Sequence, residues 1–492
     1  MGVTKPGVKK LGVVGSGAMG AGIAQTGLTA GLPVVLFDLD AAALGRAKQD
    51  IFGRLNRLVE KGQLEEDVAA SAEQRLELAA TLDSFADCDF VVEAIVEKLE
   101  PKRALFAALE NIVGPDAILA TNTSSLSVAA IAAECTRKER VCGLHFFNPV
   151  PLMKLVEVIV APGTSNETAA IATGLSHALG KIPVTVRDGP GFLVNLAGRA
   201  YVTEALHIVQ ERVADPATVD RIMRDAAGFR MGPFELMDLT GIDVNFPATG
   251  FIYAGYQYDP RLRTTTLHEL MFNAGRFGRK SGQGFHDYRE TAAPPVEPEV
   301  QAPAGFPATF VGDAEGFDQL RRDGLAEGAG PILIAPEGED AATACHRLGL
   351  DPADVIAIDF TALERRHLTL MAPLGGGGAV DDFAAWLCAQ GYRVETIKDS
   401  PGFVLQRILS MVANLGCELA QIGVGSPGDI DLAMRLAQNY PLGPLEWAAH
   451  LGPARIHRTL EAIQNATGSD RYRPSLWLRR RALLGLPIHM SD

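Results

Sequence analysis

A segment of about sixty residues occurs twice in this chain, and this repetition constrains the fold more than any other sequence feature. The run VRDGPGF at residues 186–192 returns as IKDSPGF at residues 397–403, and MGPFEL returns as LGPLEW. Asp220 and Asp431 occupy matching places in the two copies, 211 positions apart, and the glycines of the repeated runs keep the same spacing. A constant offset of this length predicts one helical domain present in two copies.

Each helical copy follows a segment with the pattern of a buried sheet. In the first segment the apolar runs KKLGVVG, LPVVLFD, CDFVVEAIVE, DAILATN and RVCGLHFF alternate with helix-like stretches. This alternation is typical of a Rossmann-type, doubly wound α/β sheet. The runs ATFVG, PILIAP and DVIAIDF precede the second copy and predict a second, degenerate α/β unit.

A proline- and alanine-rich stretch, TAAPPVEPEVQAPAG, separates the two halves and predicts a linker. The expected order is therefore an α/β domain, an all-α domain, a linker, a degenerate α/β unit and a second all-α domain. The predicted bounds are 1–187, 188–290, 291–305, 306–398 and 399–492.

Composition excludes several classes of partner. The 492 residues carry a formal net charge of −14, which disfavours nucleic acid and anionic membranes. The six cysteines never form a CxxC pair, so we expect reduced thiols and no metal site. No apolar run reaches the length of a membrane span or forms a signal peptide. These features predict a cytoplasmic protein.

A glycine-rich turn follows the first predicted strand. The run VVGSGAMGAG places Gly15, Gly17 and Gly20 in the G-x-G-x-x-G spacing, between an apolar strand and an alanine-rich helix. This spacing allows a tight turn, close approach of a pyrophosphate, and close packing of helix on strand. Asp38 ends the next strand, where a carboxylate binds the adenosine ribose and repels a 2′-phosphate. We therefore expect NAD rather than NADP; the alternative is an ordinary glycine turn.

Three functional side chains interrupt the apolar run LHFFNPVPLMKLVEVIV at residues 144–160, namely His145, Asn148 and Glu157. A buried carboxylate is costly unless it is paired. His145 ends one predicted strand and Ser124 follows the preceding strand, where ligands of parallel sheets bind. A His beside a carboxylate is a general base. Next to a dinucleotide loop, this set favours hydride transfer between an alcohol and a carbonyl. The alternative is a histidine at a strand edge and a solvated glutamate, neither with a catalytic role.

Five motifs together resemble the L-3-hydroxyacyl-CoA dehydrogenase family: GSGAMG, NTSSLS, GLHFFNPVPLMKLVEVI, DGPGFLVNL and GRKSGQGF. They occur in the family's order and spacing and extend over residues 8–287. The two-copy layout resembles the long bacterial members associated with phenylacetate breakdown, which act on 3-hydroxyadipyl-CoA or 3-hydroxybutyryl-CoA. The resemblance implies an NAD-dependent oxidoreductase of fatty-acid metabolism and β-oxidation, with a 3-hydroxyacyl-CoA as its substrate.

The resemblance also implies roles for four catalytic residues. His145 would take the proton of the 3-hydroxyl group, and Glu157 would hold His145 and stabilise the imidazolium. Ser124 would hydrogen-bond the substrate oxygen. Asn195 would orient His145 and the substrate, unless it is an amide on a helix surface.

The family's cofactor positions map onto further residues of this chain. Asn148 and Ser124 would lie near the nicotinamide end of NAD. Glu97 and Lys102 match positions that line the cofactor, and a solvated helix start is the alternative. The glycine loop supplies the remaining contacts, together with Asp38: Gly15, Gly17, Ala18, Met19 and Gly20.

Three cations match or approach family positions for the CoA part of the substrate: Arg54, Lys61 and Lys280. Lys61 matches a phosphate-binding position. Arg54 departs from the family, which more often has a small hydroxyl residue there. For all three, a plain solvated cation is the alternative.

The second half departs from the family pattern at the chemistry. Gln406 stands where the first copy has Asn195, and His367 lacks the Asn-Pro pair and the downstream Glu. The segment ATFVGDAEGFDQL takes the place of the phosphate loop but retains only Gly312 and Gly316. We therefore expect the second half to be catalytically inactive and to bind no dinucleotide.

Three other readings remain open from the sequence. A β-hydroxyacid dehydrogenase of the 6-phosphogluconate type uses a lysine as acid and base, which His145 and Glu157 disfavour. A crystallin-like dehydrogenase of a sugar acid such as L-gulonate lacks CoA. A non-catalytic NAD-binding scaffold would need no intact dyad.

The duplication also predicts how the chain assembles. In short relatives the helical domain forms the dimer interface, so the resemblance implies that two such domains pack together. We therefore expect residues 188–287 to pack against residues 399–492 within one chain. The protein would be a monomer with an internal pseudo-dimer, or a homo-oligomer.

Overall fold

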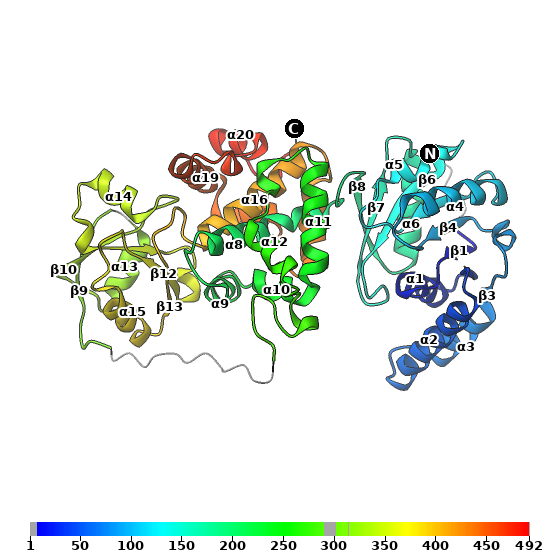
Figure 1. Ribbon diagram of the computed structural model, residues 1–492, viewed down its shortest axis with the longest axis horizontal. Coiled ribbons are helices and arrows are strands. Elements are labelled where there is room, and N and C mark those ends of the chain that lie inside the picture. Colours follow the sequence, from blue (N-terminus) through cyan, green and yellow to red (C-terminus); the bar gives the residue numbers. More distant parts are fainter. Residues whose placement is uncertain (1–6, 290–301, 313, 492) are drawn as a thin grey trace. The chain divides into compact units, whose positions relative to one another are not determined.

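The computed structural model describes residues 7–289, 302–312 and 314–491 (Figure 1). Most of the predicted linker lies outside these residues. The chain divides into two compact units, Met1–Leu196 with Gly423–Gln438, and Ala197–Ile422 with Asn439–Asp492. Within the described residues, no helix combines the length and the apolar character that crossing a membrane requires.

An eight-stranded sheet forms the centre of the first unit, in the order β3-β2-β1-β4-β5-β6-β7-β8. All neighbours are parallel except β6 and β7. The strands are β1 Leu11–Val14, β2 Val34–Phe37, β3 Leu76–Leu78, β4 Phe90–Glu93, β5 Ile118–Thr121, β6 Val141–Phe146, β7 Leu155–Val160 and β8 Ile182–Arg187. Every residue of β1, β2, β4, β5 and β6 is buried, as expected for a sheet covered on both faces. The doubly wound sheet predicted from the alternating pattern is confirmed.

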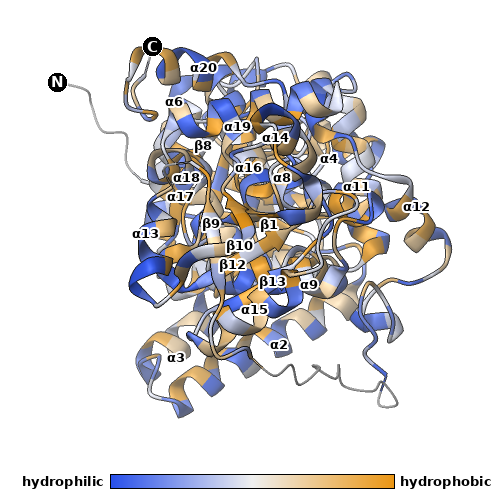
Figure 2. Ribbon diagram, turned by 90° about the vertical axis from the view of Figure 1, so that its left-hand side faces the viewer, coloured by the Kyte–Doolittle hydropathy of each residue, from blue (hydrophilic) through white to orange (hydrophobic). Residues whose placement is uncertain are grey.

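Six helices lie between the strands of the first unit, and a seventh, α7, follows β8. They are α1 Ala18–Thr29, α2 Ala41–Glu60, α3 Glu66–Arg75, α4 Leu99–Ile112, α5 Val128–Ile131, α6 Asn166–Ala178 and α7 Val194–Ala197. Helix α2 begins after Asp40, whose side chain accepts a hydrogen bond from the Ala42 amide, a standard N-cap. Its buried residues recur every three or four positions, so α2 shows hydrophobic and hydrophilic stripes in Figure 2.

A five-stranded sheet lies in the second unit, in the order β13-β12-β11-β10-β9. Its strands are β9 Pro307–Phe310, β10 Ala326–Ile334, β11 Val355–Asp359, β12 His367–Met371 and β13 Arg393–Thr396. Its helices are α13 Glu315–Arg322, α14 Ala341–Leu348 and α15 Val380–Ala389. Only β11 and β12 are antiparallel. This sheet therefore repeats β4 to β8 of the first sheet, including its single antiparallel pair.

This topology corrects one prediction. The segment ATFVGDAEGFDQL contains β9 and the start of α13, and β9 holds the place of β4 at the sheet edge. It is not the counterpart of the phosphate loop, because that loop follows β1. In the described part of the second unit, β1, β2 and β3 have no counterparts. Gly312 and Gly316 imitate the motif by sequence only.

The two helical copies share one design. The first contains α8 Arg199–Gln210, α9 Pro216–Arg221, α10 Pro233–Thr240, α11 Ile242–Gly255 and α12 Thr266–Asn273. The second contains α16 Leu405–Gln421, α17 Pro427–Gln438, α18 Pro444–Leu451, α19 Pro453–Thr467 and α20 Leu476–Leu484. Helices α10 and α18 both begin with proline after a glycine. The predicted duplication of the helical domain is confirmed.

Within the second unit the two copies pack against each other, as predicted, mainly through α8 and α16. One helix of the second copy, α17, instead belongs to the first unit and contacts β7 and β8. There the Arg187 amide donates to the Val424 carbonyl at 2.9 Å. In the second unit the Lys398 amide donates to the Val213 carbonyl, also at 2.9 Å. These bonds are the same contact in the two repeats, so each α/β sheet receives a segment from the other half's helical copy.

Candidate active site

A histidine and a carboxylate face each other across the one antiparallel strand pair of the first sheet. His145 on β6 is the direct partner of Glu157 on β7. Their side chains meet at 2.6 Å, between His145 Nδ1 and Glu157 Oε2. Directly opposed residues on such strands project to the same face. The strand register therefore creates the pair that the sequence suggested.

The burial of Glu157 is fully compensated. The residue has no exposed surface, and its second oxygen, Oε1, accepts hydrogen bonds from the amides of Leu193 and Val194 at 3.0 and 2.9 Å. Three donors thus satisfy the carboxyl group, as a buried polar group requires. Because Glu157 accepts from Nδ1–H, the lone pair of His145 lies on Nε2. His145 can accept a proton there.

A cavity of about 340 Å³ opens beside His145. It collects most of the predicted side chains at the carboxyl ends of the strands, where open α/β sheets bind ligands. The lining residues are Met19, Ala94, Ile95, Glu97, Lys102, Asn122, Ser124, His145, Phe146, Phe147, Asn148 and Asn195. The aromatic ring of Phe147 lies 4.6 Å from the His145 ring, measured between centroids.

A second charged group lies in the wall of this cavity. Lys102 is 1% exposed, and its Nζ contacts Glu93 Oε1 at 2.6 Å and Glu97 Oε2 at 3.2 Å. Glu93 is itself buried and also accepts from the Thr121 hydroxyl. Lys102 is therefore not part of a solvated helix start. Its charge is balanced inside the protein.

Glu97 connects this ion pair to Ser124. Its Oε1 accepts hydrogen bonds from the Thr123 hydroxyl at 2.6 Å and the Ser124 amide at 2.9 Å. Burial opposes ionisation, but these bonds and the Lys102 charge lower the pKa of Glu97 to about 2. Glu97 is therefore a carboxylate at neutral pH, and it fixes the turn that presents Ser124 to the cavity.

The three amide side chains of the cavity differ in their surroundings. Asn195, at the start of α7, is half-buried, and Asn148, just after β6, is exposed. Asn122 was not identified from the sequence. Its Oδ1 accepts from the Phe146 amide at 2.8 Å, which fixes the strand end next to His145. The signal was its place beside Ser124, directly after β5.

The glycine loop has the geometry of a phosphate cradle. Gly15 has φ +102°, and a Cβ there would lie 2.4 Å from the Ala94 carbonyl oxygen. A Cβ at Gly20 would lie 1.8 Å from the Gly15 carbonyl oxygen. At Gly17, the N-cap of α1, a Cβ would meet nothing within 4 Å. The loop is therefore tightly packed on its inner side and open where a pyrophosphate would approach the helix N-terminus.

Asp38 lies at the end of β2 and is tied to this loop. Its Oδ2 accepts from the Ser16 amide at 2.7 Å and the Ser16 hydroxyl at 2.8 Å. Its partial burial opposes ionisation, but hydrogen bonds from the Asp40 and Ser16 amides lower its pKa. The carboxylate is therefore charged and positioned beside the loop.

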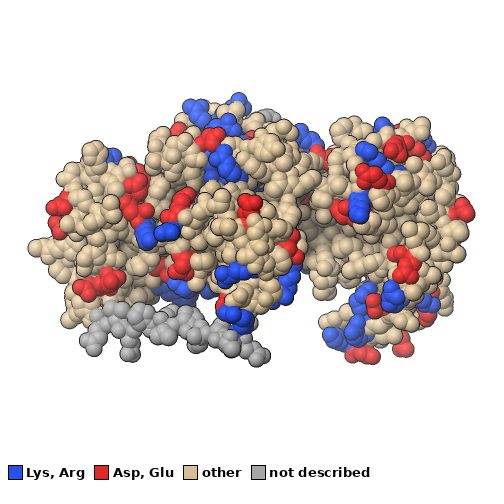
Figure 3. Space-filling model, viewed as in Figure 1, with Lys and Arg blue, Asp and Glu red and all other residues tan. Residues whose placement is uncertain are grey.

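The cations proposed for CoA belong to different units of the chain. Arg54, on α2, donates to Gln25 Oε1 at 2.6 Å, and Lys61 is exposed at the end of the same helix. Lys280 belongs to the second unit, where it pairs with Asp243 at 2.5 Å. On the face shown in Figure 3, positive side chains gather over α2 and α3 together with acidic ones.

Within the described residues, no group of three His, Cys, Asp or Glu side chains could hold a metal ion.

The second half has no dyad at the corresponding place. Asp359 on β11 pairs with Thr369 on β12, as His145 pairs with Glu157, and Thr369 in turn pairs with Glu395, the counterpart of Val184. Gln406 donates to Asp359 Oδ1 at 3.0 Å. His367 begins β12, two residues before Thr369. An Asp–Thr pair supplies no imidazole, although a cavity of about 680 Å³ remains beside Gln406.

Two family models match the chain. Residues 10–189 match the NAD binding domain of 3-hydroxyacyl-CoA dehydrogenase. Residues 191–288 and, again, 402–487 match the C-terminal domain of 3-hydroxyacyl-CoA dehydrogenase. The NAD binding domain is matched once and the C-terminal domain twice, in agreement with the observed topology.

Several known proteins are similar to this chain. A 3-hydroxyadipyl-CoA dehydrogenase of Escherichia coli K12 is 40% identical over 94% of this chain and 95% of its own length. The crystal structure of a 3-hydroxybutyryl-CoA dehydrogenase from E. coli K12 superposes with a TM-score of 0.89, at 40% identity, over 97% of this chain and 99% of the other. A probable 3-hydroxybutyryl-CoA dehydrogenase of Deinococcus radiodurans is 43% identical, over 54% of this chain and 95% of its own.

Proposed function

This chain belongs to the 3-hydroxyacyl-CoA dehydrogenase family and is an NAD-dependent oxidoreductase, and from this premise we propose that His145 and Glu157 perform the proton transfer of its reaction. The reaction is oxidation of an L-3-hydroxyacyl-CoA to the 3-ketoacyl-CoA. The observation that carries the assignment is the 2.6 Å contact between His145 Nδ1 and a fully satisfied, buried carboxylate.

NAD fits the residues of the first unit. The open side of Gly17 and the N-terminus of α1 would hold the pyrophosphate, and Asp38 would accept from the adenosine ribose. Ala18, Met19 and Gly20 at the start of α1 would continue the cofactor contacts. Asn148, Glu97 and Lys102 line the cavity and would surround the nicotinamide end. When bound, NAD supplies the acceptor for the hydride that leaves C3 of the substrate.

The protein groups move one proton. His145 Nε2 takes the proton of the 3-hydroxyl group, while Glu157 holds the ring through Nδ1 and stabilises the positive charge that forms. The hydroxyl of Ser124 and the amide of Asn195 lie in the same cavity wall, where they would hydrogen-bond the substrate oxygen and orient it toward Nε2.

Fewer residues can be assigned to the CoA part and the acyl chain of the substrate. We assign the CoA phosphates to Lys61 and Arg54 on α2 and to Lys280, of which Lys61 and Lys280 are exposed. The acyl group is of the 3-hydroxybutyryl or 3-hydroxyadipyl type, because the similar proteins of comparable length carry those names. A panel of acetoacetyl-CoA, longer 3-ketoacyl-CoAs, 3-oxoadipyl-CoA and free L-gulonate, followed by NADH absorbance, separates these substrates.

The dyad is tested by His145→Gln. We expect kcat to fall by roughly 10²–10⁴-fold with little change in NAD affinity, because only general-base catalysis is removed. His177→Gln is the matched control, since His177 is an exposed histidine on α6 of the same unit. Near-normal turnover by the His145 variant would refute the assignment. Tight NAD binding by the wild-type chain without turnover of any thioester would instead indicate a scaffold.

The proposal includes an oligomeric state and a cellular location. The mutual packing of the two helical copies supports a monomer with an internal pseudo-dimer, which light scattering of the full chain can check. The six cysteines are scattered along the sequence and never form a CxxC pair, which supports a reducing cytoplasmic location.

A further inference from the structure

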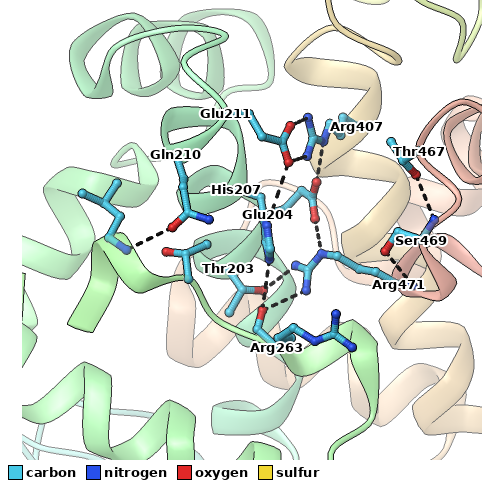
Figure 4. A network of polar contacts seen from close by, with 12 residues as sticks. Thr203, Glu204, His207, Gln210, Glu211, Arg263, Arg407, Thr467, Ser469 and Arg471 are labelled. Carbon is cyan, nitrogen blue, oxygen red and sulfur yellow. Dashed lines mark hydrogen bonds and ion pairs between the residues drawn. The ribbon is translucent and has the colours of Figure 1, made fainter. Parts of the chain in front are cut away.

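A buried cluster of charged side chains joins the two helical copies inside the second unit (Figure 4). Glu204, on α8 of the first copy, receives Arg407 Nε at 2.5 Å and the Tyr472 hydroxyl at 2.8 Å on Oε1, and Arg471 Nε at 2.7 Å on Oε2. Arg407 lies on α16, and Arg471 and Tyr472 lie in a short turn between α19 and α20. Thus one carboxylate of the first copy binds three side chains of the second.

Arg407 and Arg471 form further hydrogen bonds to the first copy. Arg407 forms a bidentate pair with Glu211, from Nη1 at 2.7 Å and Nη2 at 3.0 Å. Arg471 donates to the Thr203 hydroxyl at 2.8 Å and to three backbone carbonyls of the first copy. Glu204 and Arg407 have no exposed surface. Burial alone would raise the pKa of Glu204, but Arg471 and Arg407 hold it well below its ordinary value.

The same cluster is missing from the matching positions of the repeat. With the constant offset of 211 positions, Glu204 corresponds to Leu415, Arg407 to Leu196 and Glu211 to Ile422. The turns are matched by their helix caps, Thr265 and Ser475; this pairs Tyr472 with Leu262. These four positions are charged or polar, whereas their four counterparts are all aliphatic. The acids belong to the first copy and their arginine partner to the second.

An arginine does recur at one position. Arg261 is the counterpart of Arg471, but its ion pairs are with Asp259 at 2.6 Å and with Glu418 of α16 at 2.7 Å. The position of Glu418 is His207 in the first copy. This second cross-copy ion pair therefore also depends on a carboxylate that only one copy has.

Because of these differences, the buried charges are fully paired only when a first copy packs against a second copy. In a pair of two first copies, Glu204 would meet leucines in place of Arg407 and Tyr472, and Glu211 would lose its bidentate partner. In a pair of two second copies, Arg407 would meet Leu415 and Ile422. Leaving one member of a buried ion pair without its partner is strongly destabilising, and specificity often rests on such penalties against the wrong partner.

We propose that this cluster is a recognition surface by which the first helical copy selects the second and rejects another copy of itself. The surface on the first copy is a pair of carboxylates within an aliphatic face, and its partner must offer two arginines and a tyrosine hydroxyl. Only the second half of the same chain carries that set at the matching positions. The duplicated domain thereby becomes a matched pair, and the tether favours the intrachain partner further.

The first test compares the stability of full-length variants in denaturant titrations. Arg407→Leu installs the residue of the matching position, and we expect the unfolding equilibrium constant to rise by roughly 10²–10³-fold, because Glu204 and Glu211 lose their shared partner. Arg458→Leu is the control, since Arg458 forms an exposed ion pair with Glu337, and little change is expected. Equal stability of the two variants would overturn the proposal.

The second test separates selection from stability. A full-length variant with Glu204→Leu, Glu211→Ile, Arg407→Leu and Tyr472→Leu carries the aliphatic set on both sides. We expect it to recover much of the stability lost in the single variant. Two tagged forms of each protein are unfolded together, refolded by dilution and purified through one tag.

The tags distinguish the outcomes. We expect few mixed complexes for the wild-type chain and several-fold more for the fourfold variant, because its copies no longer reject their own kind. An equal proportion of mixed complexes in both proteins would show that the cluster does not select its partner. If the fourfold variant does not refold, co-refolding of Arg407→Leu with wild type gives the same readout, and no increase in mixed complexes overturns the proposal.

Discussion

Replacement of Glu157 by glutamine tests whether the hydrogen bonds of Glu157 set the tautomer of His145, because the two side chains have almost the same shape. The carboxylate accepts three hydrogen bonds, from His145 Nδ1 and from the amides of Leu193 and Val194. Glutamine offers one acceptor oxygen and one NH₂ donor at the same two places. The side chain must therefore choose which neighbour receives the donor.

The surrounding backbone decides that choice. If the NH₂ group faced Leu193 and Val194, two buried amides would lose their acceptor, at about 1–3 kcal/mol each. The opposite orientation keeps both amide bonds and is favoured by about 2–6 kcal/mol on that basis. The NH₂ group then donates to His145 Nδ1, so the ring proton moves to Nε2. The nitrogen that faces the substrate is no longer a base.

We therefore expect kcat for 3-hydroxyacyl-CoA oxidation to fall by roughly 10²–10⁴-fold, as for other lost general bases and wrong tautomers. NAD affinity and thermal stability should change little, because all three contacts persist. The measurement is initial-rate NADH absorbance with an NAD titration. Glu134→Gln, at an exposed turn, is the control. Turnover close to wild type in Glu157→Gln would refute the tautomer argument.

Three further perturbations follow from the site. Gly15→Ala should weaken NAD binding and lower the melting temperature, because its Cβ would lie 2.4 Å from the Ala94 carbonyl oxygen at a φ of +102°. Gly45→Ala, at an unobstructed helical position, is the control and should change neither. Equal NAD affinities of the two variants would contradict this. Asp38→Ser should shift the ratio of kcat/KM values toward NADP, and an unchanged ratio would dissociate Asp38 from cofactor choice. The pKa of Glu97 is about 2, below its usual 4.5, so its stabilisation is complete above pH 4.5 and disappears as pH falls toward 2. The difference in melting temperature between wild type and Glu97→Gln should shrink over that range, and a constant difference would argue against it.

Sequence reasoning located the dyad because its determinants are local. His145 and Glu157 lie on consecutive strands joined by a short loop, and their partner elements could be recognised as apolar runs. The glycine spacing likewise fixes a turn of a few residues. The duplication was visible for a similar reason, since a constant offset requires no knowledge of packing.

The sequence left open some contacts that only burial decides. Lys102 was expected to line the cofactor, with a solvated helix start as the alternative, and its enclosure by Glu93 and Glu97 excludes that alternative. Gly312 and Gly316 resembled the remnant of a phosphate-binding loop, yet the strand before them, β9, is the counterpart of β4. Residue spacing cannot show which strand of a sheet a short apolar run will become, because strand order is set by packing between distant elements.

The sequence by itself determined the two helical copies, the sheet that precedes them and the residue types of the His145–Glu157 pair. The tertiary structure alone decided that α17 joins the first unit and that Glu204 meets Arg407, 203 positions further along the chain. The physical reason is that strand register and turn geometry follow from neighbouring residues, whereas burial of a charge depends on the partner that the folded chain brings to it.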